Sequence, residues 1–281
     1  MSNVLEERTR SEPSREVSLE PSESAQRRSL EKPAILDVHD VTVAYHRKPV
    51  LWDVDLVIRE PRLIGIIGPN GAGKTTLLNL LTGFLRPDSG RCLLGGRETT
   101  HLAPHRIARL GVGRTFQDLR LIEQVPGLEN VMLARPNQRG EGLMAALLRF
   151  GVAKEEAANR EEAMRLLRFV GLADKAAGLA GELSYGEQKL LTIACCLATE
   201  ARILFFDEPV TGVHPEIAGQ ILDLLRRITN DGKLVVFIEH DISAVRRVAD
   251  LVIVMDDGRV ITQGPPSEVL ERPEILEAYV G

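Results

Sequence analysis

The stretch Leu63-Ile-Gly-Ile-Ile67, followed by Gly68-Pro-Asn-Gly-Ala-Gly73-Lys74-Thr75-Thr76, decides the fold. Its first part is a short apolar run, which is typical of a strand buried on both faces of a parallel sheet. Its second part fits the pattern GxxxxGK[ST] in full. An apolar helix is expected to follow, from about residue 74 to 85. The sequence therefore predicts a phosphate-binding loop (P-loop) between a buried strand and a helix.

The P-loop has the chemistry that a nucleoside triphosphate requires. Its glycines let the backbone N–H groups surround an anion, and the start of the helix adds partial positive charge. Lys74 is expected to reach the β- and γ-phosphates, and the Thr75 hydroxyl to bind Mg²⁺. We expect the nucleotide, ATP, to contact the whole loop: Gly68, Pro69, Asn70, Gly71, Ala72, Gly73, Lys74, Thr75 and Thr76. A glycine-rich turn without a ligand is the alternative, which the flanking strand and helix disfavour.

A second apolar run, residues 203–206, ends in the pair Asp207-Glu208. Ligands of parallel sheets bind at the carboxyl ends of the strands. Asp207 is expected to bind Mg²⁺ directly or through water, and Glu208 to orient or deprotonate the attacking water. Acidic pairs are also common at the starts of helices, so this prediction depends on the P-loop being present.

The other segments predict an α/β fold. Residues 35–45 and 50–58 alternate apolar and polar side chains, as half-buried antiparallel strands do. Residues 233–238 and 251–255 read as further short strands separated by helices, and residues 127–171 as helical. This rhythm predicts a mostly parallel sheet with helices on both sides.

Composition disfavours several classes of function. The chain has 281 residues and a net charge of -5, which disfavours nucleic-acid binding. No apolar run approaches the roughly 20 residues of a membrane span, so we expect a cytoplasmic chain. Cys92, Cys195 and Cys196 lack a CxxC spacing and are expected to be buried free thiols. Residues 1–33 contain 22 Ser, Glu, Arg and Pro residues, which predicts a disordered tail.

Further motifs resemble those of ABC (ATP-binding cassette) ATPases. Leu183-Ser-Tyr-Gly-Glu-Gln188 resembles the signature LSGGQ, and Ile238-Glu-His240-Asp resembles the segment of the switch histidine. Phe116-Gln117 resembles the Q-loop, whose Gln senses magnesium and the attacking water, and Tyr45 lies where the family has an aromatic ring on adenine. The motifs occur in the family's order, and the resemblance covers about residues 34–281.

This resemblance implies roles for further residues. Gln117 and His240 would act with Glu208 in catalysis, and Gln117 would also contact Mg²⁺. The signature residues would bind the nucleotide held by a second subunit: Ser184, Gly186 and Glu187. Tyr185 and Glu187 depart from the LSGGQ pattern, and His214 stands where the family usually has Asp in the loop that crosses to the other subunit. The histidine at position 214 puts the coupling of the two nucleotide sites in doubt.

The resemblance also implies an architecture and a mechanism. We expect a RecA-like P-loop core, an antiparallel β-subdomain and a helical subdomain around residues 118–190. Two such subunits, alike or different, would sandwich two ATP molecules and drive separate membrane permeases. The chain would therefore lie at the inner face of the cell membrane.

Within the family, the chain looks most like the ATPases of branched-chain amino-acid importers, which serve an external substrate-binding protein. The resemblance rests on several stretches: Gly113-Arg-Thr-Phe-Gln117, the signature, 238–245 and the C-terminal 265–281. Importers of urea or short amides and lipopolysaccharide exporters share much of this pattern. A soluble ABC ATPase of translation or DNA repair and a P-loop kinase of small molecules are the rivals from other classes.

Two other groups of residues have plain interpretations. His101 and His105 are expected to be exposed rather than to bind zinc, because no third ligand is apparent. Arg106, Arg109 and Arg114 are expected to form a solvated basic face.

Overall fold

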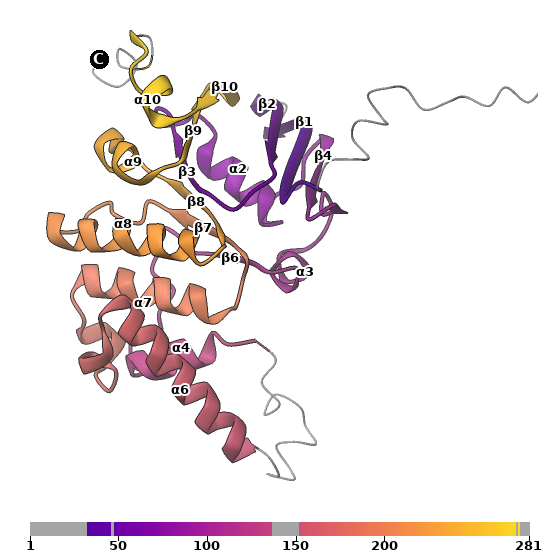
Figure 1. Ribbon diagram of the computed structural model, residues 1–281. Helices are drawn as coiled ribbons and strands as arrows, with labels where there is room; N and C mark the ends of the chain where they lie inside the picture. Colours follow the sequence, from indigo (N-terminus) through magenta and orange to yellow (C-terminus); the bar gives the residue numbers. More distant parts are fainter. Residues whose placement is uncertain (1–32, 46–47, 137–151, 274, 276–281) are drawn as a thin grey trace, which may run out of the picture. The chain divides into compact units, whose positions relative to one another are not determined.

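The computed structural model describes residues 33–45, 48–136, 152–273 and 275 (Figure 1). Residues from Ala34 onward form one compact unit. The tail predicted for residues 1–33, except its last residue, lies outside the described residues.

A six-stranded sheet forms the centre of this unit, with the strand order β10-β9-β3-β8-β7-β6. All neighbouring strands are parallel except β10, which pairs with β9 in the antiparallel sense. The mostly parallel sheet is therefore confirmed, although β6 and β10 were not expected from the sequence. The strands are β3 (Leu63–Ile67), β6 (Val112–Arg114), β7 (Ile203–Asp207), β8 (Leu234–Ile238), β9 (Leu251–Asp256) and β10 (Arg259–Gly264).

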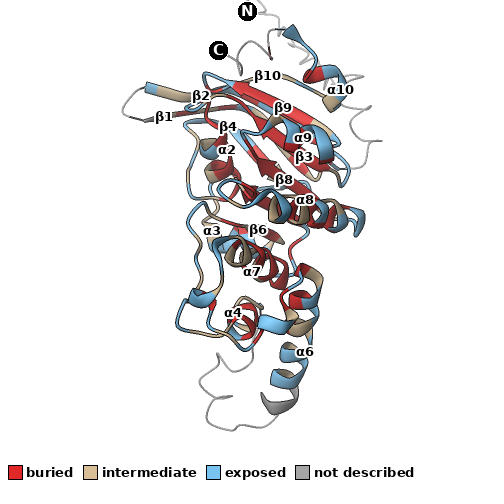
Figure 2. Cartoon of the chain, turned by 90° about the vertical axis from the view of Figure 1, so that its left-hand side faces the viewer, coloured by how far each residue is buried: buried red, intermediate tan, exposed pale blue. Residues whose placement is uncertain are grey.

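Alternation along the central strands explains the layers on either side of this sheet. Ile64 and Ile66 of β3 pack into one core, together with helix α2 (Lys74–Leu81) and the first strands of the chain. Leu63 and Ile67 point to the other face, into a core built from several later helices. Every residue of β3, β7 and β8 is buried, as the apolar runs predict (Figure 2).

The first core is closed by a four-stranded antiparallel sheet of order β2-β1-β4-β5. The two predicted early strands are confirmed as a pair whose register joins Leu36 to Ile58. Helix α2 is in contact with β2, and its Leu77 and Leu78 belong to the same core as the two strands. The strands are β1 (Leu36–Tyr45), β2 (Lys48–Ile58), β4 (Ser89–Leu94) and β5 (Arg97–Glu98).

The second core contains most of the helices. Helices α4, α6 and α7 pack on one another, and α7 and α8 are in contact, as are α8 and α9 (Figure 1). The predicted helical stretch 127–171 is confirmed at both ends, and its middle, 137–151, lies outside the described residues. The helices besides α2 are α3 (Pro104–Arg109), α4 (Gly127–Leu133), α6 (Val152–Val170), α7 (Tyr185–Ala198), α8 (Pro215–Asn230), α9 (Ile242–Val248) and α10 (Pro266–Val269).

Local chemistry explains where α2 ends. It stops at Leu81, four residues before the predicted end, because Gly83 takes a positive φ of 77° that an α-helix cannot continue. The cysteines behave largely as expected: Cys92 and Cys196 are buried, Cys195 is half-buried, and burial raises the pKa of each thiol to about 12. Among the described residues, none of the helices combines the length and the apolarity that crossing a bilayer requires.

Candidate functional site

The P-loop connects β3 to α2 in the tight conformation that its glycines allow. Gly73 precedes the helix with a φ of 91°, and a Cβ there would lie 2.8 Å from the Leu51 side chain. A Cβ on Gly68 would lie only 2.1 Å from the carbonyl oxygen of Met255. Larger residues at either position would therefore push the loop away from the sheet.

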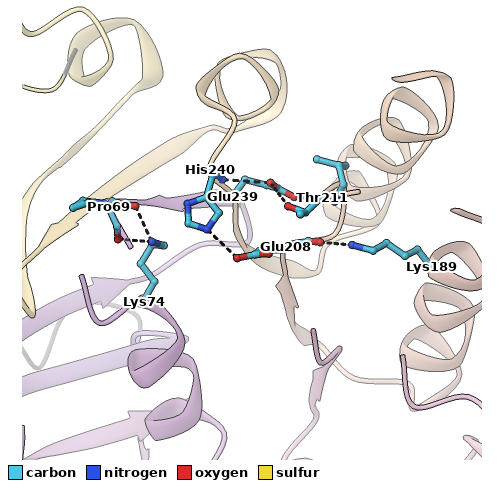
Figure 3. Close-up of polar contacts among 9 residues, drawn as sticks. Pro69, Lys74, Lys189, Glu208, Thr211, Glu239 and His240 are labelled. Carbon is cyan, nitrogen blue, oxygen red and sulfur yellow. Dashed lines mark hydrogen bonds and ion pairs between the residues drawn. The ribbon is translucent and has the colours of Figure 1, made fainter. Parts of the chain in front are cut away.

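Lys74, the first residue of α2, turns its side chain back over the loop. Its Nζ donates to the carbonyl oxygens of Gly68, at 2.7 Å, and Pro69, at 2.9 Å (Figure 3). Burial lowers the pKa of Lys74, whereas the negative charges of Glu208 and Asp207 act in the opposite direction. Lys74 therefore lies within electrostatic reach of the acidic residues at the end of β7.

Asp207, the last residue of β7, is paired with Arg114 of β6. The guanidinium Nη2 lies 3.2 Å from Oδ2 of Asp207, and the two side chains are 6% and 3% exposed. The other terminal nitrogen of Arg114 donates to Asn79 and Thr82. The expectation that Arg114 belongs to a solvated basic face is therefore wrong, because β6 pairs with β7 and turns this side chain inward. Arg106 and Arg109 are exposed.

Glu208 follows Asp207 in the chain, and its side chain contacts His240 and not Arg114. Its backbone has a φ of 49°, a left-handed conformation that is unusual for a residue with a side chain. Its Oε1 lies 2.8 Å from Nε2 of His240, at the carboxyl end of the adjacent strand β8 (Figure 3). The structure thus brings together two residues that lie 32 positions apart in the sequence.

Two further residues of this region escaped the sequence reasoning. Glu239 is 1% exposed, and its carboxylate accepts hydrogen bonds from the backbone N–H of Val210 and from the Thr211 hydroxyl. Lys189 of α7 donates from Nζ to the carbonyl oxygen of Glu208 at 2.6 Å (Figure 3). Glu239 lies inside the quoted switch segment, and Lys189 lies in the signature helix. Only the fold shows that Lys189 contacts the residue after β7, and that Glu239, which follows β8, bonds to the loop after β7.

Helix α7 begins at the signature with a reciprocal capping box. The Ser184 hydroxyl accepts from the backbone N–H of Glu187 at 3.4 Å, and the Glu187 carboxylate accepts from the N–H of Ser184 at 3.0 Å. Glu187 also pairs with Lys175. Gly186 has a packing role as well, since a Cβ there would lie 3.0 Å from Ile217 of α8.

The candidate residues do not all converge within one chain. Helices α2 and α7 contribute to the cores on opposite faces of the six-stranded sheet, so the helix of the P-loop and the helix of the signature lie on opposite sides of it. Gln117 and Thr75 are exposed, and Thr76 is half-buried. Tyr45 ends β1, and its side chain lies outside the described part of the chain.

His214 has a defined local structure. It is the N-cap of α8, where its Nδ1 accepts from the backbone N–H of Glu216 at 3.4 Å. Aspartate also caps helices through a side-chain acceptor, so a neutral histidine can replace it in this task.

Comparisons with known proteins agree with this geometry. A family model described as "ABC transporter" matches residues 51–211. The high-affinity branched-chain amino acid transport ATP-binding protein BraF of Pseudomonas aeruginosa is 35% identical over 249 residues, which cover 88% of this chain and 98% of that protein. The corresponding protein LivG of Escherichia coli is 34% identical over 251 residues, with coverage of 88% and 98%.

Solved structures extend the likeness to the fold. The crystal structure of the ADP conformation of an ATP-binding cassette of an ABC transporter matches with a TM-score of 0.77 and 31% identity, covering 88% of this chain and 99% of that one. A dimeric cassette in a post-hydrolysis state, bound to ADP and Pi, matches with a TM-score of 0.69 and 26% identity, covering 82% and 98%. The chain therefore belongs to the ABC transporter family, as one of its ATP-hydrolysing cassettes.

Proposed function

We propose that this chain is the ATP-hydrolysing subunit of an importer of branched-chain amino acids. The observation that carries the proposal is the Glu208–His240 pair facing Lys74 at the carboxyl ends of β7 and β8. The names of the two relatives, which cover nearly the whole compact unit, support the choice of substrate.

The proposed nucleotide site begins at the P-loop. Lys74 would exchange its two carbonyl partners for the β- and γ-phosphate oxygens, and the N–H groups at the start of α2 would face the same anion. The remaining loop residues would line the phosphates, and Tyr45 would stack on the adenine.

The donors near Lys74 fit a magnesium ion. Thr75 offers an exposed hydroxyl and Asp207 a carboxylate whose Oδ2 is held by Arg114, and hard oxygen ligands of this kind suit Mg²⁺. We assign these two residues and Gln117 to the metal. When bound, the ion would neutralise charge that develops on the phosphoryl oxygens.

Glu208 would act on the attacking water. In the tautomer with the proton on Nε2, the His240 imidazole would donate to Oε1 of Glu208 and so orient the carboxylate. The carboxylate would then accept a proton from the water as its oxygen bonds to the γ-phosphorus, while the bond to the β,γ-bridging oxygen breaks and ADP leaves.

A complete site would require two cassettes. Ser184 and Gly186 begin a helix whose N–H groups suit an anion, and this helix packs on the opposite face of the sheet from α2. We propose that they face the γ-phosphate bound by a second cassette, with Glu187 holding the turn through its capping box. The dimeric relative bound to ADP and Pi supports such a pair.

The proposed complex places the chain at the cytoplasmic face of the membrane. Two permease subunits would bind the cassettes there, and a substrate-binding protein would deliver the amino acid from outside. Helices α4, α6 and α7 would form the helical subdomain, about residues 118–190, beside a cassette core that begins at residue 34. No nucleic acid takes part in this proposal.

Uptake of labelled leucine tests the proposal directly. Cells that lack the chain would be complemented with the wild type or with Glu208→Gln, and the entry of leucine, isoleucine, valine and urea would be measured. We expect branched-chain uptake with the wild type only. Urea uptake alone would favour a short-amide importer, and a defect in lipopolysaccharide export would favour an exporter. If cells that lack the chain lose none of these activities, the remaining interpretation is a soluble ABC ATPase without a role in transport.

A further inference from the structure

Lys189 is a buried lysine outside the family motifs identified above. It lies in the first turns of α7 and is 8% exposed. A buried ammonium group is costly unless it is paired or hydrogen-bonded. Burial lowers the pKa of Lys189, whereas the charges of Glu239 and Glu208 raise it. Its position must therefore provide a compensating contact.

That contact is the carbonyl oxygen of Glu208, 2.6 Å from Nζ (Figure 3). The Tyr185 ring, one helical turn earlier, lies under the same ammonium with its centroid 5.4 Å away. The ring and the carbonyl together hold the Lys189 side chain in one direction, across from the signature helix to the end of β7.

The backbone of Glu208 needs such support. A left-handed conformation is unfavourable for a residue with a Cβ, and it persists where neighbouring groups hold it. The N–H of Glu208 donates to the carbonyl of Ile238 at 3.1 Å, and its carbonyl accepts from Lys189. Both polar groups of the backbone are therefore fixed, and the side chain is aimed at His240.

We propose that Lys189 is a positioning residue for ATP hydrolysis, which holds the backbone of Glu208 so that its carboxylate faces His240 and the attacking water. The inference rests on the proposed function, because it takes Glu208 as the base. Lys189 acts through Glu208 and not on the nucleotide. Its removal should therefore slow turnover without weakening ATP binding.

The chain offers a matched control at the opposite end of the same strand. Lys233 is half-buried and donates from Nζ to the carbonyl oxygen of Ala201, two residues before β7, at 2.5 Å. The chemistry of this contact equals that of Lys189, but it lies at the amino end of the sheet. A general effect of losing a lysine–carbonyl hydrogen bond would appear in both variants.

The experiment measures phosphate release with Mg²⁺ and ATP by the complex that co-purifies with the tagged chain, comparing wild type, Lys189→Met, Lys189→Arg and Lys233→Met. We expect Lys189→Met to lower kcat at least about tenfold and to change KM less than about threefold. Lys189→Arg, which keeps a donor and the charge, should recover most of the rate. Lys233→Met should match the wild type. If Lys189→Met does not fold, Lys189→Gln replaces it, since its side chain is one atom shorter and cannot reach the carbonyl.

A double-mutant cycle separates positioning from a general loss of structure. In a Glu208→Gln background, Lys189→Met should cause no further fall in the residual rate, because its effect depends on the carboxylate. A further fall of the same size, or equal losses in Lys189→Met and Lys233→Met, would overturn the proposal. If Lys189→Met is as active as an active wild type, the positioning role of Lys189 is refuted, and the proposed function of the chain is unaffected. A wild-type complex that releases no phosphate would overturn the proposed function and this inference with it.

Discussion

Nε2 of His240 lies 2.8 Å from Oε1 of Glu208, across the carboxyl ends of two adjacent parallel strands. The side chains are 38% and 19% exposed, so water can reach the pair. Backbone contacts fix both residues: Glu208 bonds to Ile238, and the N–H of His240 donates to the Glu239 carboxylate. This arrangement gives the proposed base, Glu208, a set direction and access to solvent.

Replacing Glu208 by Gln removes the base but keeps the size of the side chain. We expect ATP binding to stay intact and turnover to fall at least about a hundredfold, roughly 2.7 kcal/mol of activation free energy. Phosphate release and equilibrium nucleotide binding measure the two effects separately. Turnover near the wild-type rate would exclude Glu208 from this role.

Replacing Lys74 by Ala removes the cation that lies within electrostatic reach of the end of β7. Nucleotide affinity should fall at least about tenfold, because a charge-assisted hydrogen bond contributes about 1.5–3 kcal/mol. Binding of a fluorescent ATP analogue measures the change, and Lys233→Ala serves as the control. Equal affinities of Lys74→Ala and Lys233→Ala would contradict the assignment of the P-loop.

Replacing Arg114 by Met leaves the Asp207 carboxyl, whose pKa is already raised by burial, without its guanidinium partner. Breaking a buried pair typically costs about 3–5 kcal/mol, so the variant should unfold at clearly lower urea concentration than the wild type. Arg109→Met, on the exposed end of α3, should change stability by less than about 1 kcal/mol. Similar midpoints for the two variants would show that the ion pair contributes little.

Glu239 should make stability depend on pH. Burial, the largest influence, raises the pKa of its carboxyl, despite hydrogen bonds from Val210 and His240 that favour the charged form. The folded state therefore keeps a proton that the unfolded chain, with a pKa of about 4.3, has already released. The stability advantage of the wild type over Glu239→Gln should fall as pH rises from about 4.3 through the raised pKa.

Urea unfolding between about pH 4.5 and pH 7 tests this dependence on Glu239. Asp241→Asn is the control, because a hydrogen bond from Ser243 lowers the pKa of Asp241. The contribution of Asp241 to the free energy of unfolding is lost only as the pH falls below the ordinary Asp pKa of about 3.9. The difference in free energy of unfolding between wild type and Asp241→Asn should therefore not change between the two pH values. If the stability advantage of wild type over Glu239→Gln stays constant or grows as the pH rises, the expected sign is contradicted.

The sequence predicted the features that depend on local pattern. The strand and helix around the P-loop, the buried runs of β7 and β8 and the antiparallel pair β1–β2 follow from apolar spacing, and the structure contains all of them. Strand β6 was missed because it has three residues, too few for a periodicity. Its partner β7 is distant in the sequence, so the inward turn of Arg114 depends on a contact 93 residues away.

The contacts around Glu208 were beyond sequence reasoning for the same reason. Lys189 reads as a polar residue in an apolar helix, and Glu239 as one member of a short motif. Their roles depend on contacts 19 residues away, with Glu208, and 29 residues away, with Val210, which pattern alone does not contain.

Affinity purification of the tagged chain from its own membranes in mild detergent, with identification of the co-purifying proteins, tests the central claim most directly. The proposed complex predicts two multi-span permeases and a second ATPase of this type, identical or different. Recovery of ribosomal or DNA-associated proteins alone would contradict the role in transport, although the ATPase chemistry of the cassette would stand.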